Sequence, residues 1–155
     1  MQKLLALLLC LLFSASALGS DNGYKIVYDG GSRPNAKAGT GMRLYIDSAK
    51  VRIMKGKKEI AIIPADAITE ISYGQDVHRR VGAAIGVGVV SFGVGALLAL
   101  AKSKKHFVGL LWNNDGQKGG IAFQAEKSDY RGLLAGLEGI TGKTAVDSAT
   151  MTVKN

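Results

Sequence analysis

The chain has 155 residues, a formal net charge of +8 and a single cysteine, Cys10. This length suits one domain with short appendages, and one cysteine excludes an internal disulfide framework. The basic balance favours anionic partners, among which a phospholipid surface suits an exported chain better than nucleic acid does. An ordinary basic protein surface is the alternative interpretation.

Residues 1–19 have the layout of a secretory signal peptide. A basic residue precedes the apolar core of Leu4–Phe13, and small residues follow it. We expect cleavage after Ala17 or Gly19, which makes the mature protein exported and removes Cys10. An uncleaved signal anchor is the alternative.

Segments of alternating apolar and polar residues, and short apolar runs, predict a series of strands. Residues 20–39 are rich in Gly, Asn, Asp and Ser and predict a leader loop, in which Tyr24–Tyr28 alone suits a strand. Residues 66–73 are expected to begin as a helical turn and to continue as extended chain. The other strands are expected over residues 42–46, 51–54, 59–63, 106–112 and 120–125. Short strands joined by tight turns predict an antiparallel sheet that curls.

A helix is expected after the last of these strands. Its apolar residues are spaced i, i+3, i+4 and i+7 and share one stripe: Tyr130, Leu133, Leu134 and Leu137. Ser128 or Asp129 is expected to cap its start, and Gly139 or Gly142 its end. Residues 144–155 are expected to form a polar tail. The sequence therefore predicts an α+β fold.

An uncharged run of 21 residues, Val81–Ala101, separates the two groups of strands. About 20 apolar residues of helix cross a hydrocarbon core, so the length suits a membrane span. Small residues recur in it at spacings of four, which favour close approach of helix backbones, within a hairpin or between copies of the chain. The residues expected to serve membrane insertion and packing are Gly82, Gly86, Gly88, Gly93 and Gly95. A flexible apolar linker is the alternative.

Basic residues flank this run on both sides. The residues expected to contact anionic headgroups are Arg79, Arg80, Lys102, Lys104 and Lys105. His78 and His106 also bracket the run and would approach each other if it doubled back, but two histidines without a third ligand make a poor metal site. The basic residues of 50–58 form a second headgroup candidate, for which a solvated turn is the alternative.

The order of these elements carries a family resemblance. The runs GTGMRLYIDSAKVRIMKGKKEIAIIPADAITEISYG and KHFVGLLWNNDGQKGGIAFQAEKSDYRGLLAGLEGITGK resemble bacterial PH-like and GRAM-like domains of exported proteins. The resemblance covers residues 40–143 and implies a strongly bent antiparallel sheet, or partly open barrel, with a C-terminal capping helix. It also implies binding to lipids or proteins in place of catalysis. The glycine-rich, zipper-like apolar run departs from the family pattern as an inserted helix or helical hairpin.

One sheet and one complete membrane crossing exclude each other. A straight span over residues 81–101 would place the strands before and after it on opposite sides of the bilayer. Three interpretations remain: a hairpin that enters one leaflet with its tip near Ser91, a helix that lies on the membrane or on the sheet, or two separate folds joined by a true span.

The sequence contains no recognisable catalytic constellation. Gly142-Lys143-Thr144 lacks the preceding glycine of a phosphate-binding loop, because Leu137 occupies that position, and Ser91 lacks the glycine of a hydrolase elbow at Val89. We therefore expect no enzyme, cofactor, metal or small-molecule substrate, and no nucleic acid partner. The predicted function is that of an exported, membrane-associated binding module that self-associates. A soluble secreted or periplasmic interaction domain, whose insert packs on protein, is the alternative.

Overall fold

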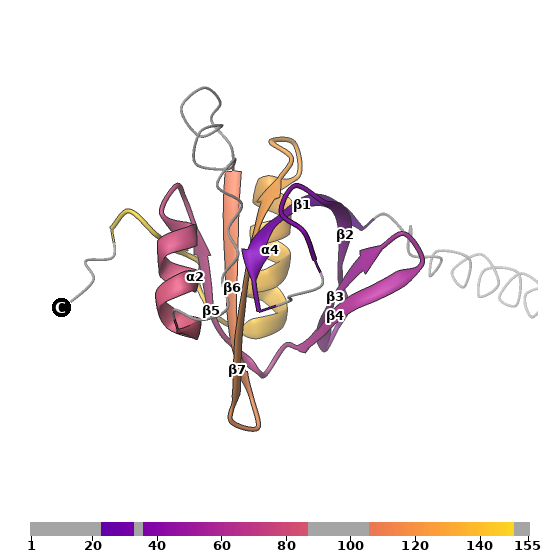
Figure 1. Ribbon diagram of the computed structural model, residues 1–155. Helices are drawn as coiled ribbons and strands as arrows, with labels where there is room; N and C mark the ends of the chain where they lie inside the picture. Colours follow the sequence, from indigo (N-terminus) through magenta and orange to yellow (C-terminus); the bar gives the residue numbers. More distant parts are fainter. Residues whose placement is uncertain (1–22, 33–35, 87–105, 151–155) are drawn as a thin grey trace, which may run out of the picture.

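The computed structural model describes residues 23–32, 36–86 and 106–150, so the predicted signal peptide lies outside the described residues. Within them the chain forms an α+β domain with one open sheet of eight strands and two helices (Figure 1). The α+β class and the predominantly antiparallel sheet predicted from the sequence are confirmed.

Two antiparallel meanders make up most of the sheet. The first contains β1 (Tyr24–Gly31), β2 (Gly41–Ile46), β3 (Lys50–Lys55) and β4 (Lys58–Pro64), and the second contains β5 (Ile68–Tyr73), β6 (His106–Asn114) and β7 (Gln117–Ala125). Strand β1 pairs with β7 and joins the meanders, while the two-residue β8 (Val146–Asp147) adds to β5 in parallel. The strand order is β4-β3-β2-β1-β7-β6-β5-β8.

Tight turns set the register within each meander. Gly56, with a φ of 59°, turns the chain between β3 and β4, where a left-handed backbone favours glycine. Asp115 and Gly116 have φ values of 50° and 83° and join β6 to β7, in agreement with the Asp-Gly hairpin signal in the sequence.

The larger core lies between the inner face of the sheet and helix α4 (Tyr130–Thr141). Leu133 and Leu137 of α4 are fully buried against strand residues such as Leu44 and Phe123. Gly142 ends the helix in a left-handed conformation with a φ of 67°, which confirms one of the two predicted C-caps. Asp129 occupies the N-cap position without a side-chain capping bond.

Helix α2 (Val77–Ile85) packs on the opposite face of the sheet. Figure 1 shows β6 and β7 nearly edge-on, with α2 on one side and α4 on the other. A second core cluster fills this outer interface with Val77, Val81, Phe107 and Ala122. The sheet is therefore covered on both faces where β6 and β7 run.

Two boundaries expected from the sequence were wrong. The strand expected over Tyr24–Tyr28 continues through Gly31 in the middle of the sheet, so the leader loop is shorter than predicted. The polar tail contributes β8, whose Val146 lies opposite Ser72 of β5. In both cases strand pairing placed residues without an apolar strand pattern in the sheet. The first residues of the apolar run, 81–85, form the end of α2, which begins before the run at Val77.

Candidate functional site

The candidate site is the region where the apolar run leaves the domain and returns to it. Residues 87–105 connect α2 to β6 and lie outside the described residues, together with Gly88, Gly93 and Gly95 and the three predicted headgroup-binding lysines. The described ends are Gly86, exposed after α2, and His106, the first residue of β6. The structure thus defines where the run is attached.

The strands that precede and follow the apolar run belong to the same sheet. Strand β5 precedes the run and β6 follows it, and the two pair directly, from Ile68 opposite Trp112 to Tyr73 opposite Val108. Helix α2, which precedes the run, packs on β6 and β7, which follow it. The chain before residues 87–105 and the chain after them therefore form one structural unit.

Helix α2 anchors the start of the run by an apolar stripe. Val77, Val81 and Ile85 recur at intervals of four residues, and the first two are fully buried. Two strand glycines make room for them. A Cβ atom on Gly109 would lie 2.8 Å from Val77, and one on Gly120 would lie 3.0 Å from both Val81 and Ile85. Because these two strand positions carry no side chain, α2 can pack closely on the sheet.

Two polar links supplement this apolar contact. The Nδ1 atom of His78 on α2 lies 2.5 Å from Oδ2 of Asp29 on β1. The imidazole ring also packs edge-on against Phe107, with the ring centroids 4.6 Å apart. Arg80 forms a bidentate ion pair with Glu70 of β5. Asp29 is only 2% exposed, so its contact with His78 is shielded from water.

Their surroundings shift the pKa values of His78 and Arg80. Burial lowers the pKa of His78 below its usual value of 6.5, and the nearby carboxylates of Asp29 and Asp76 oppose this shift without reversing it. The hydrogen bonds to Glu70 raise the pKa of Arg80. His78 is therefore neutral at pH 7, and its Nδ1–H can donate a hydrogen bond to the Asp29 carboxylate.

The predicted site residues have different surroundings in the structure. Arg79 is exposed on α2, whereas Arg80 is held by Glu70, a partner that the sequence did not indicate. Gly82 is half-buried in α2, and Gly86 ends the helix with a φ of 82° in open space. The packing and headgroup roles of these residues stay predictions.

The two histidines that bracket the apolar run do not share a site. His78 contacts Phe107 on the outer face of the sheet. His106, which precedes Phe107 in β6, stacks on Tyr130 of α4, with ring centroids 4.5 Å apart. Successive strand residues point to opposite faces, so the sheet separates the two rings. Within residues 23–32, 36–86 and 106–150, no group of three or more His, Cys, Asp or Glu residues is placed to hold a metal ion.

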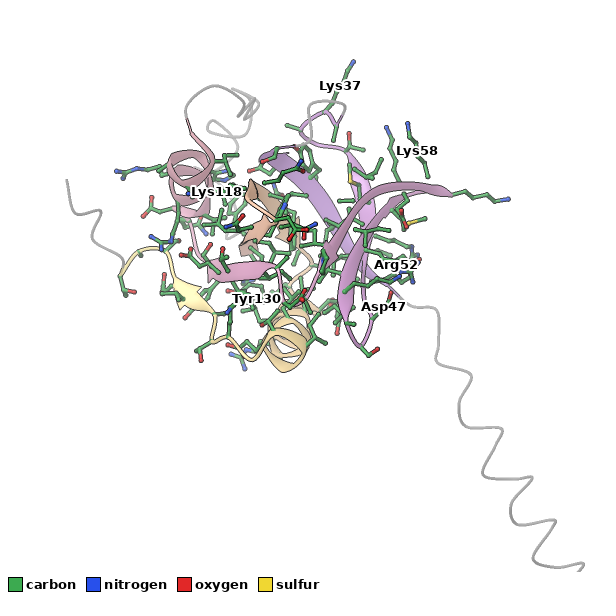
Figure 2. The ribbon with its side chains drawn as sticks, turned by 90° about the horizontal axis from the view of Figure 1, so that it is seen from below. Lys37, Asp47, Arg52, Lys58, Lys118 and Tyr130 are labelled. Carbon is green, nitrogen blue, oxygen red and sulfur yellow. The ribbon has the colours of Figure 1, made fainter. Side chains whose placement is uncertain are left out.

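In the second basic group, on β3 and its turn, Arg52 already contacts other side chains of the domain. Arg52 forms a hydrogen bond of 2.7 Å from Nε to Oδ2 of Asp47, and its guanidinium carbon lies 5.1 Å from the ring centroid of Tyr45. Figure 2 shows Asp47 and Arg52 together, while Lys58 points away from the body of the domain. A headgroup role for this group also stays a prediction.

Comparisons with known proteins do not assign the chain to a family. No family model matches the sequence, and no curated protein matches it significantly. In the part of the chain that the structure describes, neither helix combines the length and apolar character needed to traverse a bilayer.

The sequence did not point to the residues that hold α2 on the sheet. Asp29 follows a strand that was expected to end at Tyr28, and Glu70 is one acidic residue in an otherwise ordinary strand. Glycines at 109 and 120, inside apolar strands, were the available signal, because glycine within a strand often marks close approach of another segment.

We expect Gly109→Ala to destabilise the domain by about 1–3 kcal/mol, because the added methyl group overpacks the α2 interface. Besides Val77, it would meet the hydroxyl of Ser72 at 2.7 Å. The measurement is urea-induced unfolding. Gly139→Ala is the matched control: its Cβ meets nothing within 4 Å on the exposed face of α4, so it should leave stability unchanged or raise it by up to about 1 kcal/mol. Equal effects of the two variants would contradict the packing described for α2.

Stability is expected to decrease as the pH falls below about 6.5. The unfolded chain takes up a proton at His78 near pH 6.5, whereas burial lowers the pKa of His78 in the folded chain. The unfolded state therefore binds more protons in this window, and acidification favours it. Urea unfolding midpoints between pH 7.5 and 5.5 test this. His78→Gln, which keeps a donor for Asp29, should flatten the profile, and His106→Gln should not. A midpoint that rises on acidification would show that the imidazolium–Asp29 ion pair outweighs burial.

Proposed function

We propose that the chain is an exported, non-enzymatic binding module with a PH-like fold, attached to a membrane from one side by residues 87–101. The observation that carries this proposal is the direct pairing of β5 with β6 across the apolar run. A single crossing would pull these paired strands to opposite sides of the bilayer. A run that enters the membrane must therefore return to the side on which it began.

The length of the remaining apolar run supports the same conclusion. Helix α2 takes up residues 81–85 and Gly86 ends it, so fifteen uncharged residues, 87–101, remain. As a helix they would extend about 22 Å, which is less than the roughly 30 Å of a hydrocarbon core. Insertion into one leaflet fits this length better than a crossing does. The three lysines among residues 102–105 would then lie at the headgroups.

The PH-like fold is proposed from the topology. Two meanders joined through β1 and β7, with α4 across the inner face, agree with a bent, partly open barrel capped by its C-terminal helix. In this arrangement α2 and the apolar run form an insertion between β5 and β6. The insertion changes the attachment of the domain and leaves its two meanders intact. Self-association through the glycines of the run belongs to the same proposal.

A second candidate function is a soluble exported interaction domain whose apolar run packs on protein. The observation in its favour is that the first part of the run already packs on the domain's own sheet, through Val81 and Ile85. Under this alternative, residues 87–101 would continue an intramolecular or intermolecular interface. The two candidates differ in whether the run binds lipid.

Flotation with sealed vesicles tests membrane attachment. We expect the full chain to float with vesicles that contain anionic phospholipid, and to remain bound in 0.5 M salt, because apolar insertion is not screened as surface electrostatics are. Replacing residues 87–101 with a Gly-Ser linker should abolish flotation while the domain stays folded. A full chain that remains unbound with both anionic and neutral vesicles would overturn the proposal.

A further inference from the structure

A groove of about 720 Å³ lies on the outer face of the sheet, over β1, β2, β3 and the end of β7. Its wall residues Lys25, Val27 and Arg43 alternate along their strands with buried residues of the inner core. The groove therefore opens on the face opposite α4. Its volume falls within the range of about 300–1,000 Å³ that is typical of small-molecule sites.

Gly41 creates part of this hollow. It lies opposite Val27 in the β1–β2 register, and a Cβ atom added to it would meet nothing within 4 Å. Its φ is not among the positive values in the chain, so a larger residue is compatible with its backbone. The groove can consequently be filled by substitution at Gly41 without backbone strain.

Two cationic side chains lie next to each other in the groove wall. Lys25 and Arg43 are directly opposite in the β1–β2 register and project on the same face, an arrangement that is unfavourable between like charges. Lys25 lies 3.9 Å from Glu126, but both side chains are more than half exposed, so this ion pair is weak. Arg43 donates a hydrogen bond of 3.2 Å to the carbonyl of Gly23. An anion placed between the two cations would relieve their repulsion.

Apolar and amide groups continue the groove beyond these charges. Val27 and Met54 are half-buried in its lining, and Gln124 adds an amide that can donate or accept hydrogen bonds. Methionine adapts readily to apolar ligands of different shapes because its side chain is unbranched and polarisable. The lining thus combines a charged end, where two cations outnumber the carboxylate of Glu126, with an adaptable apolar wall.

We propose that this groove binds a small amphiphilic anion, with its anionic group between Lys25 and Arg43 and its apolar body along Val27 and Met54. Charge complementarity selects the anionic end, and the half-buried apolar side chains select the body. A fatty carboxylate and an alkyl phosphate share this chemistry. The site is separate from the apolar run and does not depend on membrane attachment.

Amide chemical shifts in the full chain test the proposal with three probes below their micelle concentrations: octanoate, octyl phosphate and octyl glucoside. We expect the first two to shift the amides of Lys25, Arg43 and Gln124 saturably, and the neutral octyl glucoside not to do so. The relative affinities of the two anions then identify carboxylate or phosphate as the preferred group. Equal binding of octyl glucoside, or the absence of saturable shifts at these amides, would overturn the proposal.

Substitutions separate the groove from other surfaces that bind amphiphiles. Gly41→Trp fills the groove and leaves no space for the ligand, and Arg43→Gln removes a charged hydrogen-bond partner of its anionic group. Each substitution should weaken octanoate binding by about tenfold or more. Lys118→Gln is the matched control, because Lys118 is exposed near α2 and away from β2 (Figure 2). Unchanged binding in Gly41→Trp and Arg43→Gln, or an equal loss in Lys118→Gln, would contradict the groove as the site.

Discussion

A chain carrying Leu97→Asp and Leu98→Asp together should lose vesicle binding by at least about 100-fold. A carboxylate costs up to about 2.5–3.5 kcal/mol at the centre of an apolar helix in a bilayer, and two of them nearer its end together still exceed the roughly 2.8 kcal/mol of a 100-fold loss. The measurement is the vesicle concentration that gives half-maximal flotation. The loss is large because both substitutions lie in the apolar run that we propose as the attachment.

The same variant separates the two candidate functions. If residues 87–101 bind lipid, the free energy of unfolding in the absence of vesicles should change by no more than about 0.5 kcal/mol. If the run packs on protein, two buried charges should destabilise the domain or dissociate an oligomer. Ser48→Asp with Ala49→Asp is the matched control, because both positions lie in an exposed turn and the change in net charge is the same. Equal loss of flotation in the control would indicate general electrostatic repulsion in place of insertion.

His78→Ala is expected to reduce the free energy of unfolding by about 3 kcal/mol. The change removes the imidazole that contacts the buried Asp29 carboxylate and leaves a cavity beside Phe107. Urea unfolding followed by the fluorescence of Trp112 measures this loss. Arg79→Ala, the exposed neighbour on the same helix, should change stability by about 0.5 kcal/mol or less.

A double-mutant cycle shows whether His78 acts through Asp29. Combining His78→Ala with Asp29→Ala should give an interaction energy of at least about 1 kcal/mol, because the two side chains are in direct contact. Additive losses would mean that each residue supports the fold independently, and that the contact does not link α2 to β1.

The local sequence pattern was sufficient to predict most strands of the sheet. Strands β2 and β3 alternate between apolar and polar residues because one face of each lies in the larger core, and this period is visible in the sequence. The apolar stripe of α4 and its Gly142 cap were visible for the same reason. Asp115-Gly116 fixed the β6–β7 hairpin through its backbone preference.

Elements that depend on distant partners were not predictable in this way. The second half of β1, Asp29–Gly31, has the composition of a loop and is extended because β7 pairs with it. The stripe of α2 merges with the uncharged residues that follow it, so the length of the run suggested a span. Glu70 and Asp29 became identifiable as partners of α2 only when the fold brought the helix over their strands.

Attachment from one side of the membrane can be measured by the sidedness of labelling in sealed vesicles. In the mature chain, from which signal cleavage is expected to remove Cys10, Lys58→Cys reports the chain before the apolar run and Lys118→Cys reports the chain after it; both positions are exposed. A membrane-impermeant maleimide should label the two vesicle-bound variants to the same extent before detergent is added. Labelling of one variant, with the other protected until detergent opens the vesicles, would contradict attachment from one side.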